Sequence, residues 1–185
     1  MISRFSKLFA VITSFVLLGG CASYSITEQE MTSYLTDNIA MNQSVGVQPL
    51  LYAEVSVDDL EVKIGRADAD RISVFANTTA DVQMYNTPNK SLDLDIEFSA
   101  VPEYNKDTGE IFLKSLKLER FEEKSGQLPS NLVMLLEPAV STIGYALSQQ
   151  PAYKLDSSDF KQSLLKSAEP NLVIKGNKLV IDLLD

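Results

Sequence analysis

The chain has 185 residues, of which 45% are hydrophobic and 22% are charged, and its formal net charge at pH 7 is −9. It contains one cysteine and neither histidine nor tryptophan. This excludes catalysis by Ser-His-Asp or Cys-His groups and metal sites built from histidine, and the acidic balance disfavours nucleic acid and anionic head groups as partners.

The first twenty-one residues have the pattern of a bacterial lipoprotein signal. The basic residues Arg4 and Lys7 precede an apolar run that ends at Leu18, and two glycines stand directly before Cys21. This pattern is typical of a secretory signal peptide, and a cysteine directly after the expected cleavage site resembles a lipobox. We therefore expect removal of residues 1–20 and lipidation of Cys21. The alternatives are a secreted chain with a chance cysteine and an uncleaved anchor, although the run is shorter than the ~20 residues of a membrane-spanning helix.

The predicted mature chain is a lipid-anchored periplasmic protein. Residues 21–26 are expected to form a lipidated N-terminus and short tether, and residues 27–185 a single α+β domain. Ala22, rather than aspartate, follows the lipidated residue, which favours the outer membrane by resemblance to enterobacterial sorting. The mature part keeps fourteen basic and twenty-five acidic residues, a side-chain charge of −11, and no cysteine for a disulfide.

A short helix is predicted to begin at Thr27. Thr27 and Glu30 have the spacing of a capping box, and Ile26 and Met31 that of the flanking hydrophobic staple. Apolar residues at helical spacing continue this face as far as Ile39.

Period-two alternation predicts a meander of long antiparallel strands in the middle of the chain. The first run, 53–64, changes phase after Asp58-Asp59, which indicates a bulge or a tight turn. In the runs 72–84 and 92–100, apolar and polar residues alternate, as in a sheet with one buried apolar face and one solvent-exposed polar face. Three later residues continue the pattern: Phe112, Leu116 and Leu118.

A change to helical period predicts a long apolar helix over 129–149. Its apolar stripe consists of Leu132, Leu135, Leu136, Ala139, Val140, Ile143 and Leu147. A helix apolar over most of its circumference is enclosed by other elements, and Pro138 is expected to kink it. A short helix over 159–167 and a hairpin around a Gly176-Asn177 turn are expected to follow.

The fold class that these elements predict is α+β. A long curved antiparallel sheet is expected to wrap around the long apolar helix, with a short N-terminal helix and a C-terminal hairpin.

Four segments resemble the YceB-like family of uncharacterised outer-membrane lipoproteins of gamma-proteobacteria. They are YSITEQE (24–30), IGR (64–66), GEIFLK (109–114) and QQPAYKL (149–155). The resemblance runs from the lipobox to the C-terminal hairpin. That family is distantly similar to the tubular lipid-binding (TULIP) superfamily, in which a curved sheet wraps a long helix and the gap holds acyl chains. The resemblance implies no activity and no catalytic residues.

The apolar interior is the remaining functional signal. We expect it to hold a lipid or another elongated apolar ligand between sheet and helix, because methionines and aromatic rings adapt to a flexible ligand. The residues expected to line this site are Phe75, Met84, Phe98, Phe112, Leu132, Leu135, Leu136, Ala139, Ile143 and Tyr153. The alternative is an ordinary solid core, in which Gly144 and Pro138 are plain helix irregularities and Tyr153 packs where Pro151 ends the helix.

No motif indicates an enzyme, a cofactor or a metal. Asp68-Ala69-Asp70 lacks the remainder of a calcium loop, and 105–109 looks like a hairpin turn. Asp93 and Asp95 lie on the polar side of an alternating strand, where a solvated face is the simpler interpretation.

The sequence therefore predicts an outer-membrane-anchored periplasmic lipoprotein that binds a lipid or fatty acid and acts as a carrier or sensor. Its membrane contact is the anchor on Cys21, and its protein partner is unknown. The alternative is an interaction module with a solid core, which docks an envelope protein through its acidic face or an exposed sheet edge. An enzyme is the third hypothesis, and would need a concave carboxylate cluster with perturbed titration.

Overall fold

The computed structural model describes residues 23–38, 42–47, 51–86, 88–126, 140–141, 144–145, 147–159, 162–163 and 171–182. These residues form two antiparallel sheets and one short helix, α2 (Glu28–Asn38). The larger sheet contains β2 (Asn42–Val47), β3 (Leu51–Ile64), β4 (Ile72–Met84), β5 (Lys90–Asn105), β6 (Glu110–Glu123) and β7 (Pro151–Lys154), in that order. The smaller sheet has the order β1 (Ser23–Thr27), β9 (Lys178–Asp182) and β8 (Asn171–Ile174).

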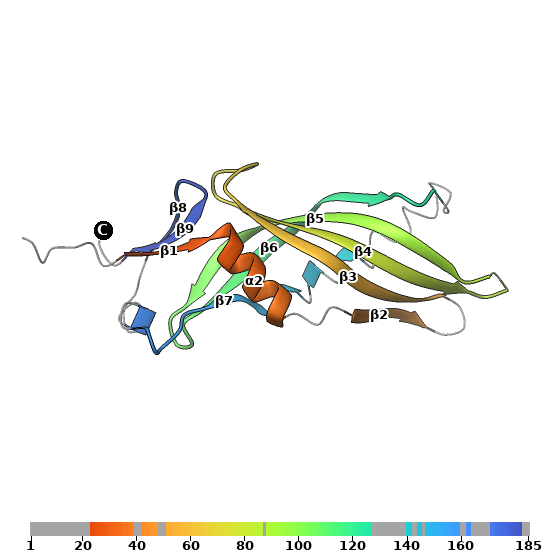
Figure 1. Ribbon diagram of the computed structural model, residues 1–185, viewed down its shortest axis with the longest axis horizontal. Coiled ribbons are helices and arrows are strands. Elements are labelled where there is room, and N and C mark those ends of the chain that lie inside the picture. Colours follow the sequence, from red (N-terminus) through yellow and green to blue (C-terminus); the bar gives the residue numbers. More distant parts are fainter. Residues whose placement is uncertain are drawn as a thin grey trace, which may run out of the picture.

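The molecule is elongated, and its long strands β3 to β6 curl together along its length (Figure 1). The small sheet lies at one end, and the hairpin between β4 and β5 forms the other. The predicted meander of long antiparallel strands is thus confirmed. The predicted α+β class is corrected to mostly β, because β1, β2 and β7 add strands that are too short to show a clear alternation in the sequence.

Bulges give the long strands their curvature. In the pairing of β3 with β4, Asp58 is the extra residue, which confirms the bulge predicted from the phase shift. The Thr79 hydroxyl donates a hydrogen bond to Asp58 Oδ2 at 2.7 Å. Register shifts opposite β5 place extra residues in β6, near Ser115 and Glu119, and Ser115 has a φ of 50°. Such bulges bend a strand and increase its twist.

These bulges also correct the predicted phase of β6. Ile111 and Leu113 are the buried residues at its start, so Phe112 faces the opposite side of the sheet. The bulge at Ser115 then changes the phase, and Leu116 and Leu118 rejoin the core side. A period-two pattern through Phe112, Leu116 and Leu118 is therefore wrong at Phe112.

The apolar side chains of β3, β4 and β5 share one face of the sheet, which divides into two clusters. The first, which we call the proximal cluster, joins this face to α2 and the small sheet and includes Ile26, Met31, Ile64, Ile72, Ile111, Leu155, Leu179 and Ile181. The second, the distal cluster, consists of Ala53, Val55, Ala80, Val82, Leu92, Leu94, Ile96, Phe98 and Val140.

The start of α2 has the predicted capping box. The backbone N–H of Thr27 donates to Glu30 Oε2 at 2.8 Å, and the N–H of Glu30 donates to Thr27 Oγ1 at 3.2 Å. Ile26 and Met31 are both fully buried in the proximal cluster, as a hydrophobic staple requires. Both features are confirmed.

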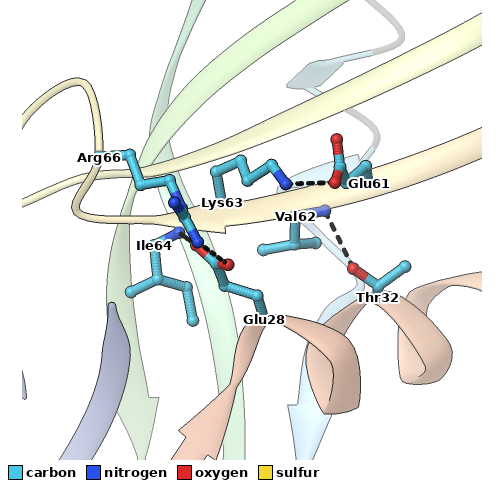
Figure 2. A network of polar contacts seen from close by, with 7 residues as sticks. All are labelled: Glu28, Thr32, Glu61, Val62, Lys63, Ile64 and Arg66. Atoms are coloured by element: carbon cyan, nitrogen blue, oxygen red, sulfur yellow. Dashed lines mark hydrogen bonds and ion pairs between the residues drawn. The ribbon is translucent and has the colours of Figure 1, made fainter. Parts of the chain in front are cut away.

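Helix α2 also closes an otherwise open edge of β3. Strand β2 pairs with β3 only as far as Ser56, and beyond it the N–H groups of Val62 and Ile64 donate to Thr32 Oγ1 at 2.9 Å and Glu28 Oε1 at 2.8 Å (Figure 2). Two residues four apart on a helix are separated by ~6 Å along its axis, which matches the ~6.6 Å between alternate residues of a strand. The helix therefore satisfies backbone donors that would otherwise attract another strand.

Glu28 has a second partner at this edge. Arg66 Nε donates to Glu28 Oε1 and Arg66 Nη2 donates to Oε2, both at 2.7 Å. The hydrogen-bonded guanidinium lowers the pKa of Glu28 below its ordinary value of 4.5 against the opposing effect of burial. The ionised carboxylate thus ties α2 to the turn after β3.

We expect Glu28→Gln to lower the free energy of unfolding at pH 7 by about 1 kcal/mol, since glutamine keeps the acceptor but loses the charge. A carboxylate whose pKa is depressed in the folded state stabilises the protein above its unfolded pKa, and loses that effect as pH falls through the folded value. In urea unfolding curves, the difference from the parent should therefore begin to shrink as pH falls below the ordinary glutamate value of 4.5, and should disappear only below the lower folded-state pKa. Glu54→Gln, at an exposed position of β3, is the control; a difference that persists at low pH would contradict the role given to the charge.

The predicted C-terminal hairpin is confirmed. Gly176 and Asn177 have φ values of 60° and 58°, as the two central residues of a type I′ turn require. Lys175 and Lys178 exchange backbone hydrogen bonds across the turn, and Ile174 pairs with Leu179.

The described part of the segment expected to be a tether, residues 23–26, lies in a strand. Ser23–Thr27 forms β1, which pairs along its whole length with β9, from Ser23 opposite Asp182 to Thr27 opposite Lys178. Ile26 is fully buried there. The free edge of the hairpin strand β9 gives this segment a pairing partner that local sequence does not reveal.

Only part of the predicted long helix can be assessed. Val140, Ser141, Gly144, Tyr145 and Leu147 are helical. Leu132, Leu135, Leu136, Ala139 and Ile143 lie outside the described residues, as do Pro138 and all of 159–167 except 159 and the helical pair 162–163. Within the described part of the chain, α2 is the longest helix.

Candidate functional site

The concave apolar face at the distal cluster is the first candidate site. Residues of the predicted helix lie on this face: Val140 belongs to the distal cluster, and Leu147 packs against it. At Gly144 the contact is very close, because a Cβ atom there would lie 2.6 Å from Cε1 of Phe98. Sheet and helical residues thus meet as predicted, and the absence of a side chain at Gly144 allows them to approach.

The predicted ligand-lining residues are not all brought together. Phe98 is buried in the distal cluster. Phe75 pairs with Glu61 and Glu97, and alternation places it on the opposite face of the sheet. Phe112 likewise faces away from the core and has the Lys114 ammonium 4.8 Å from its ring centroid. The expectation of a shared interior is therefore wrong for Phe75 and Phe112.

Two further positions are only partly described. The backbone of Met84 ends β4 opposite Leu51, but its side chain lies outside the described residues. Tyr153 is half-buried in β7 and packs against the proximal cluster, far along the sheet from Phe98. The alternative prediction was that Tyr153 packs where Pro151 ends the helix. It did not anticipate that Pro151 and Tyr153 lie in a strand, β7.

Tyr153 belongs to a second candidate site, an open groove between α2 and β7. Its volume is about 410 Å³, within the range of about 300–1,000 Å³ typical of ligand pockets. Its lining residues are Thr27, Gln29, Glu30, Ser33, Tyr34, Tyr153 and Lys154. We call it the α2 groove.

Two tyrosine rings form one wall of the α2 groove. The ring centroids of Tyr34 and Tyr153 are 5.6 Å apart, with planes tilted by 44°. The hydroxyl of Tyr153 is also 3.1 Å from that of Tyr24 in β1. Burial is the main cause of the raised pKa of Tyr153, and the hydrogen bond to Tyr24 adds to it. Both rings of the wall therefore stay neutral at physiological pH, since the pKa of Tyr34 is also raised by burial.

Two charged side chains line the α2 groove, Glu30 and Lys154. Lys154 Nζ lies 2.8 Å from Glu110 Oε1, and this hydrogen bond raises the pKa of Lys154. Glu30 has one carboxylate oxygen, Oε2, engaged with the N–H and hydroxyl of Thr27. The groove is therefore polar and aromatic, and the ammonium that lines it is already paired with a carboxylate.

The four segments that resemble the YceB-like family are linked by side-chain contacts, and the first and fourth of them line this groove. Glu28 of the first contacts Ile64 and Arg66 of the second. Lys154 of the fourth contacts Glu110 of the third, while the two tyrosine hydroxyls join the fourth to the first. Sequence reasoning identified these segments and the capping box, but not the contacts among them.

The part of the chain that the structure describes contains no cluster of acidic or cysteine side chains able to hold a metal ion. None of the helices in that part is long and apolar enough to cross a bilayer.

These features define a class: a mostly β protein with a curled antiparallel sheet, an apolar concave face and a polar groove beside the short helix α2. The chain belongs to the DUF1439 family, described as a protein of unknown function, which matches residues 26–178.

Relatives extend this match over the whole chain. The "Uncharacterized lipoprotein YceB" of Escherichia coli (strain K12) is 23% identical over 186 residues, which cover 99% of this chain and 100% of the relative. The protein of the same name from Salmonella typhimurium is 23% identical over 169 residues, covering 89% and 90%. The resemblance to the YceB-like family is thereby confirmed.

Proposed function

We propose that this protein is an envelope lipoprotein, anchored through Cys21 to the outer membrane and facing the periplasm, that binds a lipid or fatty acid against the concave face of its sheet. It acts as a carrier or sensor and performs no chemistry on the ligand. The anchor is supported by the signal pattern before Cys21 and by relatives whose names describe lipoproteins.

The observation that carries the ligand proposal is the distal cluster. Nine apolar residues from β3, β4, β5 and the helical segment face one another inside a curled sheet, and small residues lie among them. Ala53 pairs with Val82, and Val55 with Ala80, so side chains of low volume lie side by side on this wall. Side chains of low volume on this wall support the proposal that an acyl chain lies against it, as in the tubular lipid-binding proteins that the sequence distantly resembles.

Ala80→Phe tests the proposal, because it places a large ring on the concave face where the side chain is 3% exposed. We expect the parent domain, residues 22–185 produced in the bacterial periplasm, to carry lipid in native mass spectrometry and to take up a fluorescent fatty acid. The variant should fold but lose most of this uptake. In a solid core the same change would instead overpack the interior and cost about 1–3 kcal/mol of stability.

Gln83→Phe is the matched control, since it adds the same ring to the same strand at an exposed position. It should bind like the parent. The proposal would be contradicted if native mass spectrometry found only the ligand-free mass of the parent domain and the parent took up no fatty acid. That result would favour the interaction module with a solid core.

A further inference from the structure

The α2 groove contains hydrogen-bonding groups that the fold leaves unused. The amide of Gln29 and the hydroxyls of Ser33 and Tyr34 have no hydrogen-bond partner among the described residues. Each of these groups is able both to donate and to accept. They lie on one side of the groove because positions 29 and 33 are four apart on α2, with Tyr34 beside them.

The charges argue against an anionic ligand. An anion would meet the carboxylates of Glu30 and Glu110, and the ammonium of Lys154 is already paired with Glu110. A cation would meet that same ammonium, whereas a neutral ligand whose groups both donate and accept suits Gln29, Ser33 and Tyr34 without needing a charged partner.

The two tyrosine rings narrow the class of ligand further. The rings of Tyr34 and Tyr153 pack against each other and line the groove next to the polar groups of α2. A sugar ring has the matching character, with apolar C–H faces and hydroxyls around its rim. We propose that the α2 groove is a binding site for a neutral carbohydrate, separate from the concave face and independent of the lipid function proposed above.

The test uses the full lipoprotein in nanodiscs of phosphatidylethanolamine and phosphatidylglycerol, with saturation-transfer NMR on cellobiose, maltose and chitobiose. Choline and inorganic phosphate serve as charged comparators. We expect saturable transfer to at least one disaccharide. Tyr34→Ala, which removes the wall, should weaken its affinity about tenfold or more, and Gln29→Ala should weaken it less without affecting folding, because Gln29 is exposed.

Tyr145→Ala is the matched control, because Tyr145 is 69% exposed and lies in the helical segment rather than the groove. It should leave the affinity within about twofold of the parent. The proposal would be overturned if saturation transfer were seen only to choline or phosphate, or to none of the probes. It would also be overturned if disaccharide binding survived both Tyr34→Ala and Gln29→Ala.

Discussion

Gly65→Ala is expected to lower the free energy of unfolding by about 2–4 kcal/mol. Gly65 follows β3 with a φ of 64°, a conformation that strains any residue with a side chain. An added Cβ would also lie 2.5 Å from Cγ2 of Ile174 in β8. Because Ile174 packs against the proximal cluster, it has little freedom to move, and β-branching restricts its rotamers. Urea unfolding at pH 7 measures the loss.

Gly176→Ala separates the two causes. Gly176 has nearly the same φ, 60°, but apart from its chain neighbours no described residue has an atom within 4 Å of its added Cβ, so this variant should lose only about 1 kcal/mol from backbone strain. Combining Gly65→Ala with Ile174→Ala should recover part of the larger loss, since the clashing methyl group is gone. Equal losses at the two glycines, or strictly additive effects in the double variant, would show that the Ile174 contact is unimportant.

Gly144→Ala is expected to destabilise the protein by about 1–3 kcal/mol, which is opposite in sign to the usual effect in a helix. Alanine normally stabilises a helix by ~1 kcal/mol relative to glycine. Here its Cβ would lie 2.6 Å from Cε1 and 3.1 Å from Cζ of Phe98, whose ring is 5% exposed. The helical segment must therefore move away from the sheet or the ring must shift within the distal cluster. Thermal and urea unfolding both report the change.

Ser141→Ala, at an exposed helical position, is the control and should be neutral or slightly stabilising. Phe98→Leu should reverse much of the Gly144→Ala loss in the double variant, because the shorter side chain does not reach the added methyl group. If Gly144→Ala stabilised the protein, the close packing of the helical segment on Phe98 would be refuted.

Local patterns predicted local structure well. The phase shift at Asp58 gave the bulge, the Thr27–Glu30 spacing gave the capping box, and the Gly176-Asn177 pair gave the hairpin turn. In each case the cause lies within a few residues of the effect. The alternation in 72–84 and 92–100 likewise identified the buried faces of β4 and β5.

Features that depend on distant partners were missed or misplaced. Strand β1 forms because it pairs with the edge of β9, and β7 forms because it pairs with the start of β6. Neither segment shows a clear alternation of apolar and polar residues in the sequence. Phe112 was assigned to the wrong face because the bulge at Ser115 depends on pairing with β5. The α2 groove combines residues more than a hundred positions apart, such as Tyr34 and Tyr153, so no spacing in the sequence predicts it.

The pairing of Ser23 with Asp182 brings the two ends of the described domain together. With the proposed lipid anchor on Cys21, both of these ends would lie close to the lipid surface. The β4–β5 hairpin forms the opposite end of the molecule (Figure 1). Strand β5 has 16 residues and extends up to about 50 Å. With the proposed anchor, the concave face would therefore extend along the long axis of the molecule, away from the anchored end.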